Sequence, residues 1–335
     1  MVADRGGHRG ARAVQRRRRG QLGGGVPGDL GSARTAPSAR GRGRFREVQV
    51  GGVAVVTDST ADLPRDLVEA EQLRVVPLSV AFGTEVLTSG VTIDPPTFYG
   101  RLARTEGLPT TSQPAPAWFE EAYADCADDG LDAVVSVHCS GALSGTVALA
   151  RDRAAQAALP VEVVDSRLVS GGLGLAVLAG HRVAARGGDV GEVVAAVERV
   201  CRQVTTLVTV DTLDYLRRGG RLTGAQALVG RALQVKPLLH LVDGRVEVRE
   251  RTRTWGRVLD RIGSLAEEAA AGRPVDVIVA HAVAPERAAE VWERLEARVQ
   301  LGERLETLMG PIVGTHVGPG AVGLALVPSQ ATPDA

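Results

Sequence analysis

The sequence predicts an α/β protein with two domains, a parallel-sheet domain at residues 50–205 and a mixed α+β domain at residues 206–328. Three observations lead to this prediction. The chain has 335 residues, which is enough for two ordinary domains. Short β-branched runs alternate with helical segments through the first half, as is typical of a parallel sheet. Near residue 205 this pattern gives way to a hairpin and a mixture of strands and helices.

The first half contains four predicted strands separated by helices. The run at 53–56 is β-branched, and Asp58, Ser59 and Thr60 after it suit the capping of a helix. Further strands are expected at 75–80, 132–137 and 161–164. Helices are expected to begin at Asp62 and to span 94–104, 114–127, 146–158, 172–186 and 190–203.

The second half combines strands, helices and one hairpin. Asp243 and Gly244 between two apolar runs predict the turn of a β-hairpin formed by 238–242 and 245–249. Residues 310–327 predict a Gly-rich turn between short strands, and 329–335 a tail. The other predicted strands are 207–210 and 275–280, and the predicted helices are 212–218, 224–233, 254–271 and 285–298.

The composition excludes several classes of protein. The chain is 44% hydrophobic and 23% charged, as in globular proteins, and it has no apolar run of 18 or more residues and no signal-peptide core. Cys126, Cys139 and Cys201 lack CxxC spacing, which argues against a disulfide framework and against a cysteine-only zinc site. We therefore expect a cytoplasmic protein.

Residues 1–49 differ from the rest of the chain. They contain 12 arginines and 3 acidic residues, a net charge of +9, so the remainder carries −9. This Gly/Arg-rich segment has no periodic apolar pattern, and we predict that it is disordered. It is either a basic arm that could bind nucleic acid, or upstream sequence included by a start codon assigned too early. The acidic remainder argues against nucleic acid as a partner.

Common catalytic motifs are missing from the sequence. The only lysine, Lys236, precedes a proline, so no Walker A loop is present. Residues 318–323 match GxGxxG, but they run into a strand-like segment instead of a helix. Ser144 lies in Leu-Ser-Gly and not in a GxSxG elbow. Because the chain also lacks HExxH and EF-hand patterns, we expect no catalytic apparatus, no metal and no cofactor.

Polar side chains nevertheless gather in two loops of the predicted sheet. Thr110, Thr111 and Ser112 precede a helix start, and residues 140–146 form a strand-to-helix turn, where free N–H groups favour an anion. Parallel sheets bind ligands at the carboxyl ends of their strands. His316 lies in the Gly-rich turn at 310–327. Each loop alone could simply cap a helix, and a lone histidine in a turn is usually structural.

An ordered set of short motifs resembles the DegV family. The set spans about residues 53–328 and follows the order of the motifs in that family. It consists of the segments 57–60, 109–114, 143–146, 165–166, 220–226 and 314–320. The resemblance implies a two-domain α/β fold with a long-chain fatty acid buried between the domains. It also implies a partner, a separate fatty-acid kinase that uses ATP to form an acyl-phosphate for phospholipid synthesis.

The resemblance also implies roles for individual residues. Thr111 and Ser144 would hydrogen-bond the carboxylate, with His316 completing the polar end of the site. Arg221, Arg253 and Arg257 would face the kinase, although the nearby Arg249 and Arg251 make the register of that segment ambiguous. The arm at 1–49 has no counterpart in the family. The loop residues expected to support the site are Thr110, Ser112, Gly145, Thr146, Gly314 and Gly318.

Two alternatives remain open at the level of sequence. Residues 173–178 and 228–233 could line a tunnel, where each buried CH₂ contributes about 0.8 kcal/mol to binding, or they could be ordinary core. The protein could instead be a serine hydrolase that uses Ser144 and His316, although no acid is assigned to complete a triad. Fatty acid that co-purifies with the protein would distinguish a carrier from a hydrolase.

Overall fold

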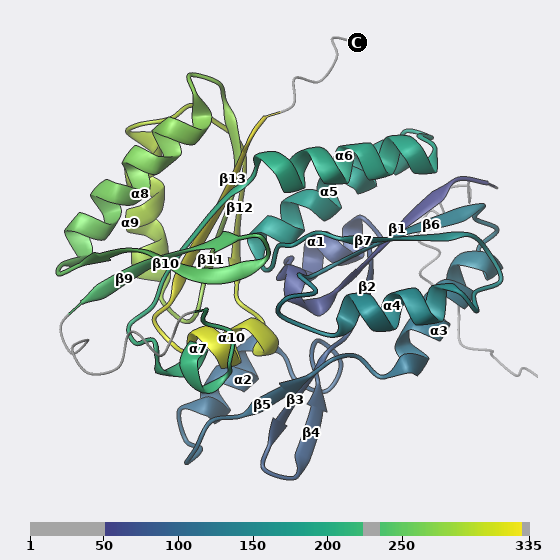
Figure 1. Ribbon diagram of the computed structural model, residues 1–335, viewed down its shortest axis with the longest axis horizontal. Coiled ribbons are helices and arrows are strands. Elements are labelled where there is room, and N and C mark those ends of the chain that lie inside the picture. Colours follow the sequence, from purple (N-terminus) through teal and green to yellow (C-terminus); the bar gives the residue numbers. More distant parts are fainter. Residues whose placement is uncertain (1–50, 224–234, 330–335) are drawn as a thin grey trace, which may run out of the picture. The chain divides into compact units, whose positions relative to one another are not determined.

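The computed structural model describes residues 51–223 and 235–329, which fold around two large β-sheets and one small one (Figure 1). The predicted arm at 1–49, the predicted helix at 224–233 and almost all of the predicted tail lie outside the described residues.

The first large sheet is parallel, as predicted. It consists of β1 (Val53–Asp58), β2 (Arg74–Val76), β6 (Ala133–His138) and β7 (Val161–Asp165) in the order β2-β1-β6-β7. Its strands are rich in valine because helices cover both faces. Side chains alternate between the faces, so those of β1 and β6 contribute to two different hydrophobic clusters.

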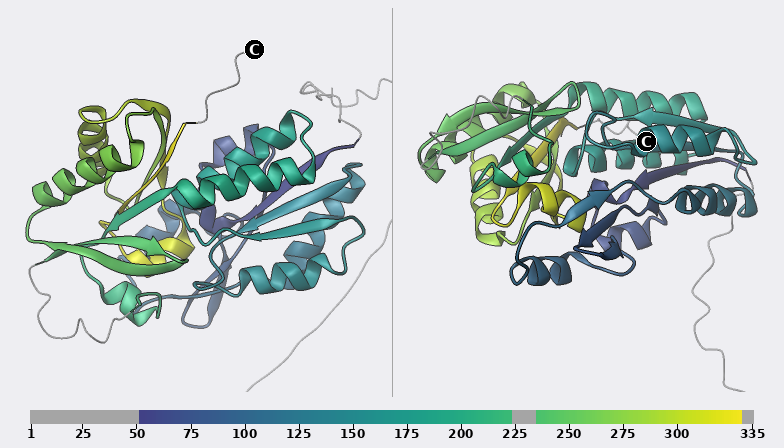
Figure 2. Two further views of the ribbon diagram at one scale, coloured as in Figure 1. Left: turned by 45° about the horizontal axis from the view of Figure 1, so that its top comes forward. Right: turned by 60° about the horizontal axis from the view of Figure 1, so that its bottom comes forward.

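Four helices cover this sheet. On one face, α3 (Pro116–Asp128) and α4 (Thr146–Ala154) pack over Val56 and Val134. On the other face, α5 (Gly171–Ala185) and α6 (Val190–Gln203) pack over Val55 and Val135. The last two helices lie side by side (Figures 1 and 2). Asp189 begins α6 with a capping box that it forms with Glu192.

The second large sheet is mixed, as predicted. Its order is β10-β9-β8-β13-β11-β12, and only the pair β11–β12 is parallel. The hairpin turn at Asp243 and Gly244 is confirmed, since both residues have positive φ angles. Helices α8 (Trp255–Ala270) and α9 (Pro285–Glu296) pack on one face. The strands are β8 (Thr205–Thr209), β9 (Lys236–Val242), β10 (Arg245–Thr252), β11 (Val275–His281), β12 (Leu301–Leu308) and β13 (Val322–Pro328).

The expected strand at 75–80 is wrong, because the chain leaves the first sheet at Pro77. Strand β2 ends at Val76, and β3 (Ser79–Phe82) begins a separate antiparallel sheet with the order β4-β3-β5. Pro77 has no N–H to continue a ladder, so it marks the change of sheet. The other two strands are β4 (Glu85–Thr88) and β5 (Thr110–Ser112), and β5 occupies the segment expected to be a loop.

The expected turn at the start of 310–327 is also wrong. Residues Pro311–Val317 form a helix, α10, which follows β12, a strand that the sequence did not indicate. Pro311 at the first helical position favours a helix start, and Gly318, with φ of 75°, ends it. His316 therefore lies in the last turn of a helix. The remaining short elements are η1 (Ser59–Ala61), α1 (Arg65–Ala70), α2 (Pro95–Leu102) and α7 (Asp214–Arg218).

Helix α5 joins the two large sheets into a shared core. Its Leu173 packs in a cluster with Val55 of β1 and with Ile278 and Ala325 of the second sheet. The change from one sheet to the other falls between α6 and β8, where the domain boundary is expected, but separate domains remain a prediction. Within the described residues, no helix is long and apolar enough to cross a membrane.

Candidate functional site

A cavity of about 240 Å³ lies among η1, β5, the loop before α4 and α10. The wall combines polar and apolar groups, and it brings together segments that are far apart in the sequence. Three residues expected at the polar end, Thr111, Ser144 and His316, all line it. The other polar side chains of the wall belong to Thr60, Ser112, Gln113, Cys139 and Arg221.

His316 is held against Thr111 across the cavity wall. The Nε2 atom of His316 lies 2.8 Å from Oγ1 of Thr111. Burial, together with the positive charge of Arg221, lowers the pKa of His316 to about 4, so the ring is neutral at physiological pH. Nδ1 is buried without a partner, and a buried orphan N–H is rarer than an orphan acceptor. We therefore assign the proton to Nε2, which donates to Thr111.

This tautomer directs the hydroxyl hydrogen of Thr111. Because Oγ1 accepts from His316, its own hydrogen is available to a ligand in the cavity. Strand β5 aims Thr111 at α10, whereas its neighbour Thr110 is exposed and does not line the cavity. Ser112 does line it.

Ser144 is arranged in a similar way at the start of α4. Its Oγ lies 2.8 Å from Oγ1 of Thr146 and accepts from the N–H of Thr146 at 3.3 Å. When the Thr146 hydroxyl also donates, the hydrogen of Ser144 is left for a ligand. A Cβ atom on Gly145 would meet the end of the Gln113 side chain, which would have to move to make room for it.

Arg221, which the resemblance places on the side facing the kinase, belongs to the wall of the polar cavity. It is half-buried and lines the cavity, where Nε donates to Leu143 O at 3.2 Å and Nη1 to Gly219 O at 2.5 Å. No acidic side chain in the described part of the chain pairs with it. Arg253 and Arg257 are exposed and do not line the cavity.

The glycines around His316 serve packing and not the approach of a ligand. A Cβ atom on Gly314 would lie 2.5 Å from the hydroxyl oxygen of Tyr99, and one on Gly318 would lie 2.5 Å from the ring of Tyr215. Both glycines therefore let an aromatic ring reach α10, which fixes the helix that carries His316.

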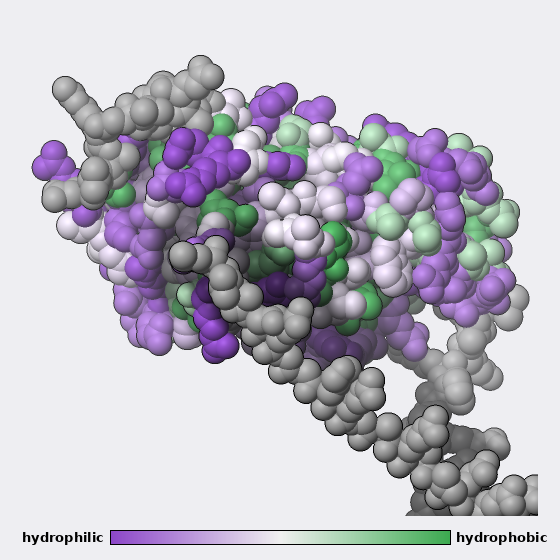
Figure 3. All heavy atoms as spheres, turned by 90° about the horizontal axis from the view of Figure 1, so that it is seen from below, coloured by the Kyte–Doolittle hydropathy of each residue, from purple (hydrophilic) through white to green (hydrophobic). Residues whose placement is uncertain are grey.

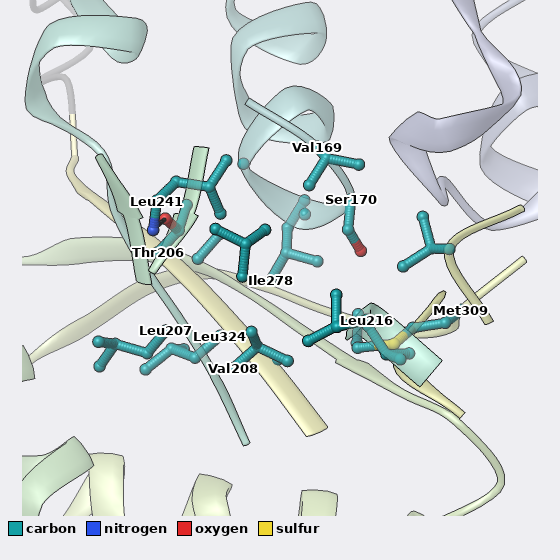
Figure 4. A pocket seen from close by; sticks show the side chains of 18 residues that line it. Val169, Ser170, Thr206, Leu207, Val208, Leu216, Leu241, Ile278, Met309 and Leu324 are labelled. Atoms are coloured by element: carbon teal, nitrogen blue, oxygen red, sulfur yellow. Dashed lines mark hydrogen bonds between the residues drawn. The ribbon is translucent and has the colours of Figure 1, made fainter. Parts of the chain in front are cut away.

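A second cavity, of about 70 Å³, is apolar (Figure 4), and it adjoins the first, since the two share lining residues. Ser170 and Thr206 contribute its only polar side chains among the described residues. Gly171 and Gly172 of α5 line it, but residues 173–178 do not and instead belong to the core. The segment 228–233 lies outside the described residues. Both cavities share the side chains of Val169, Leu216, Val246, Val313 and Val317.

The structure offers no support for the hydrolase alternative. Ser144 pairs with Thr146 while His316 pairs with Thr111, so the supposed nucleophile and base are not hydrogen-bonded to each other.

The surface seen from below combines hydrophilic and hydrophobic residues (Figure 3).

A buried network behind the cavity was not found from the sequence. Asp58 lies 3.1 Å from His138 Nδ1, and His138 Nε2 lies 2.7 Å from Ser136 Oγ. All three side chains are fully buried and none lines the cavity, so a ligand in the cavity does not contact them. Asp58 also accepts from Thr60 Oγ1 at 2.6 Å and from the N–H of Cys139 at 3.0 Å, so it holds two residues of the cavity wall. The only signal in the sequence was a possible cap at Asp58.

Comparison with known proteins gives consistent matches over most of the chain. The family model described as "Uncharacterised protein, DegV family" matches residues 52–329. A DegV domain-containing protein of Streptomyces coelicolor is 42% identical over 275 residues, which cover 82% of this chain and 98% of that protein.

Two solved structures are similar in both sequence and fold. One is a fatty-acid-binding DegV family protein of Thermus thermophilus, with 34% identity and a TM-score of 0.78, covering 83% of this chain and all of the other. Another is DegV, a fatty-acid-binding protein of Bacillus subtilis, with 33% identity and a TM-score of 0.76, covering 83% and 99%.

Proposed function

Because this chain belongs to the DegV family, we propose that it binds a long-chain fatty acid, with the carboxylate in the polar cavity and the acyl chain in the apolar one. The observation that carries this proposal is the junction of the two cavities, which share five apolar side chains. A fatty acid has the same division into a charged end and an apolar chain. The two solved relatives described as fatty-acid-binding support the same ligand class.

The head group would be bound by hydroxyl donors and one cation. Thr111 and Ser144 would donate to the carboxylate, His316 would orient Thr111, and Arg221 would neutralise the charge. Hydrogen bonds to a charged group contribute about 1.5–3 kcal/mol each, which offsets the cost of removing the carboxylate from water. Burial of a long acyl chain contributes on the order of ten kcal/mol before ordering costs.

Native mass spectrometry of the purified full chain tests this function. Wild-type protein should carry fatty acid, and Ser144→Ala and Thr111→Val should each lose roughly tenfold or more in affinity. Ser264→Ala is the matched control, because its hydroxyl donates to Asp260 O within α8 and lines neither cavity. Full lipid occupancy in both cavity variants would show that the head group binds elsewhere.

We further propose that the protein is a non-catalytic carrier that presents the carboxylate to a separate fatty-acid kinase. Two features support this role. Among its described residues, the polar cavity holds donors for the acid but no paired nucleophile and base. Arg253 and Arg257 are exposed at the junction of β10 and α8. Neither arginine pairs with an acidic side chain in the described residues, so both could orient an anionic partner.

A further inference from the structure

Asp62 lies at a junction of four segments beside both cavities. Its Oδ2 accepts from Ser170 Oγ at 2.6 Å, its Oδ1 accepts from the N–H of Gly310 at 2.8 Å, and its carbonyl oxygen accepts from Thr307 Oγ1 at 2.6 Å. These donors come from the start of α5, the N-cap of α10 and the end of β12. Asp62 is only 7% exposed.

Asp62 and Ser170, which are joined by one of these hydrogen bonds, both have unfavourable backbone conformations. Asp62 has φ of 50°, and Ser170 has φ of 54° with ψ of −138°, a region that serine rarely adopts. The N–H of Ser170 also donates to Thr60 O at 2.7 Å. Two strained residues thus hold each other, one beside Thr60 of the polar cavity and the other in the wall of the apolar cavity.

The contact with Gly310 matters because α10 is short. A helix of seven residues does not persist without tertiary contacts, so its position is set by its anchors. Tyr99 packs at Gly314 and Tyr215 at Gly318. At the N-terminal end, Asp62 is the side chain that accepts from the N-cap residue Gly310, next to the backbone hydrogen bond from Met309 to His281. A Cβ atom on Gly310 would lie 2.9 Å from Oδ1 of Asp62, so this contact requires a glycine.

We propose that Asp62 is a positioning residue that fixes α10 so that His316 meets Thr111, and that it thereby gives the cavity its preference for a carboxylate. Asp62 lines neither cavity, so it acts through α10 and does not touch the ligand. This inference rests on the proposed function.

The test compares binding of oleic acid and oleyl alcohol, which share an acyl chain but differ in head group. Wild-type protein should prefer the acid. Asp62→Ala should reduce that preference on the order of tenfold. Gly310→Ala disturbs the same contact from the side of α10 and should have the same effect. Asp62→Asn should retain it, because the amide can accept from Gly310 and donate to Ser170. In nitrogen-15 histidine spectra, the Nε2–H of His316 should lose its hydrogen-bonded signature only in the two alanine variants.

Asp189→Ala is the matched control, since it removes a helix cap from α6, which lines neither cavity. An unchanged preference in the alanine variants, or equal losses for acid and alcohol, would overturn the role of Asp62. If Asp62→Ala does not fold, Gly310→Ala decides, because its backbone angles, φ −68° and ψ 172°, are open to alanine. Absence of fatty-acid binding by wild-type protein would instead contradict the proposed function.

Discussion

Thr111 and Ser144 show how single hydroxyl groups can be turned into directed donors. Each hydroxyl oxygen can accept a hydrogen bond from a neighbouring side chain, Thr111 from His316 and Ser144 from Thr146. The hydrogen of each hydroxyl is then free to point at a ligand, at no further ordering cost on binding. The positive charge of Arg221 favours the same arrangement, because it disfavours a second proton on the buried ring of His316.

The charge state of His316 gives a first prediction. Because burial and Arg221 lower its pKa to about 4, the folded protein should keep this ring neutral between pH 5 and pH 8. Nitrogen-15 spectra of histidine-labelled protein should show one ring with no titration in that range. Arg221→Ala removes one cause, so the pKa of His316 should rise in that variant. Titration of the His316 ring near 6.5 in wild-type protein would contradict its neutral state.

Asp62 gives a second prediction, on stability. Burial raises its pKa from 3.8 to about 7, with a smaller contribution from the negative charge of Asp58. The folded state therefore holds a proton that the unfolded state releases above about pH 4, and this contribution to stability is lost as pH rises to about 7. Denaturant unfolding should show that the free energy of unfolding of wild-type protein falls, relative to that of Asp62→Asn, as pH rises from about 4 to about 7. A pH-independent difference would contradict the raised pKa.

Among the elements, most strands of the two large sheets and the long helices were predictable, whereas β12 and α10 were not. Valine-rich runs gave the strands of the parallel sheet, and Asp243-Gly244 gave the hairpin, because both signals are local. The glycines of the segment 310–320 indicated a turn. In the structure, Gly314 and Gly318 make room for the rings of Tyr99 and Tyr215, which are distant in sequence, so the sequence pattern could not reveal helix α10. The motifs grouped Thr111, Ser144 and His316, which all line the polar cavity, but the half-buried state of Arg221 depends on tertiary contacts.

The role of the glycines in α10 leads to a third prediction. Gly314→Ala should destabilise the protein and weaken acid binding, because its Cβ would lie 2.5 Å from the Tyr99 hydroxyl and 2.9 Å from Phe98. Gly256→Ala in α8 is the matched control, since nothing lies within 4 Å of the added methyl group. That control lies in the first turn of α8 and should not be less stable than wild type. Equal melting temperatures for both variants would contradict the packing role.

For the whole molecule, burial separates the two arginines that the sequence grouped together. Arg221 lines the polar cavity, whereas Arg253 is exposed beside α8. Replacing Arg221 should therefore weaken binding of the ligand, whereas replacing Arg253 should weaken only association with an anionic partner. This division follows from burial and could not be obtained from the order of motifs.

A fourth prediction uses this division. Arg253→Ala should keep its fatty acid and its melting temperature, while ATP consumption by the cognate fatty-acid kinase falls at low carrier concentration. Arg221→Ala should lose fatty acid before the kinase is added. The measurement is a coupled ATP assay with lipid-loaded carrier over a range of concentrations and salt. Turnover with Arg253→Ala equal to wild type at every concentration would exclude a partner role for that arginine.

The position of β13 has a consequence for biosynthesis. This strand is the last in the described chain, yet it lies in the middle of the six-stranded sheet, between β8 and β11. Until it leaves the ribosome, the hairpin side and the β11–β12 side have no strand to join them, whereas all four strands of the parallel sheet have already been made. A chain that ends before Val322 should thus form the first sheet but leave two open strand edges, to which a strand of another chain can pair.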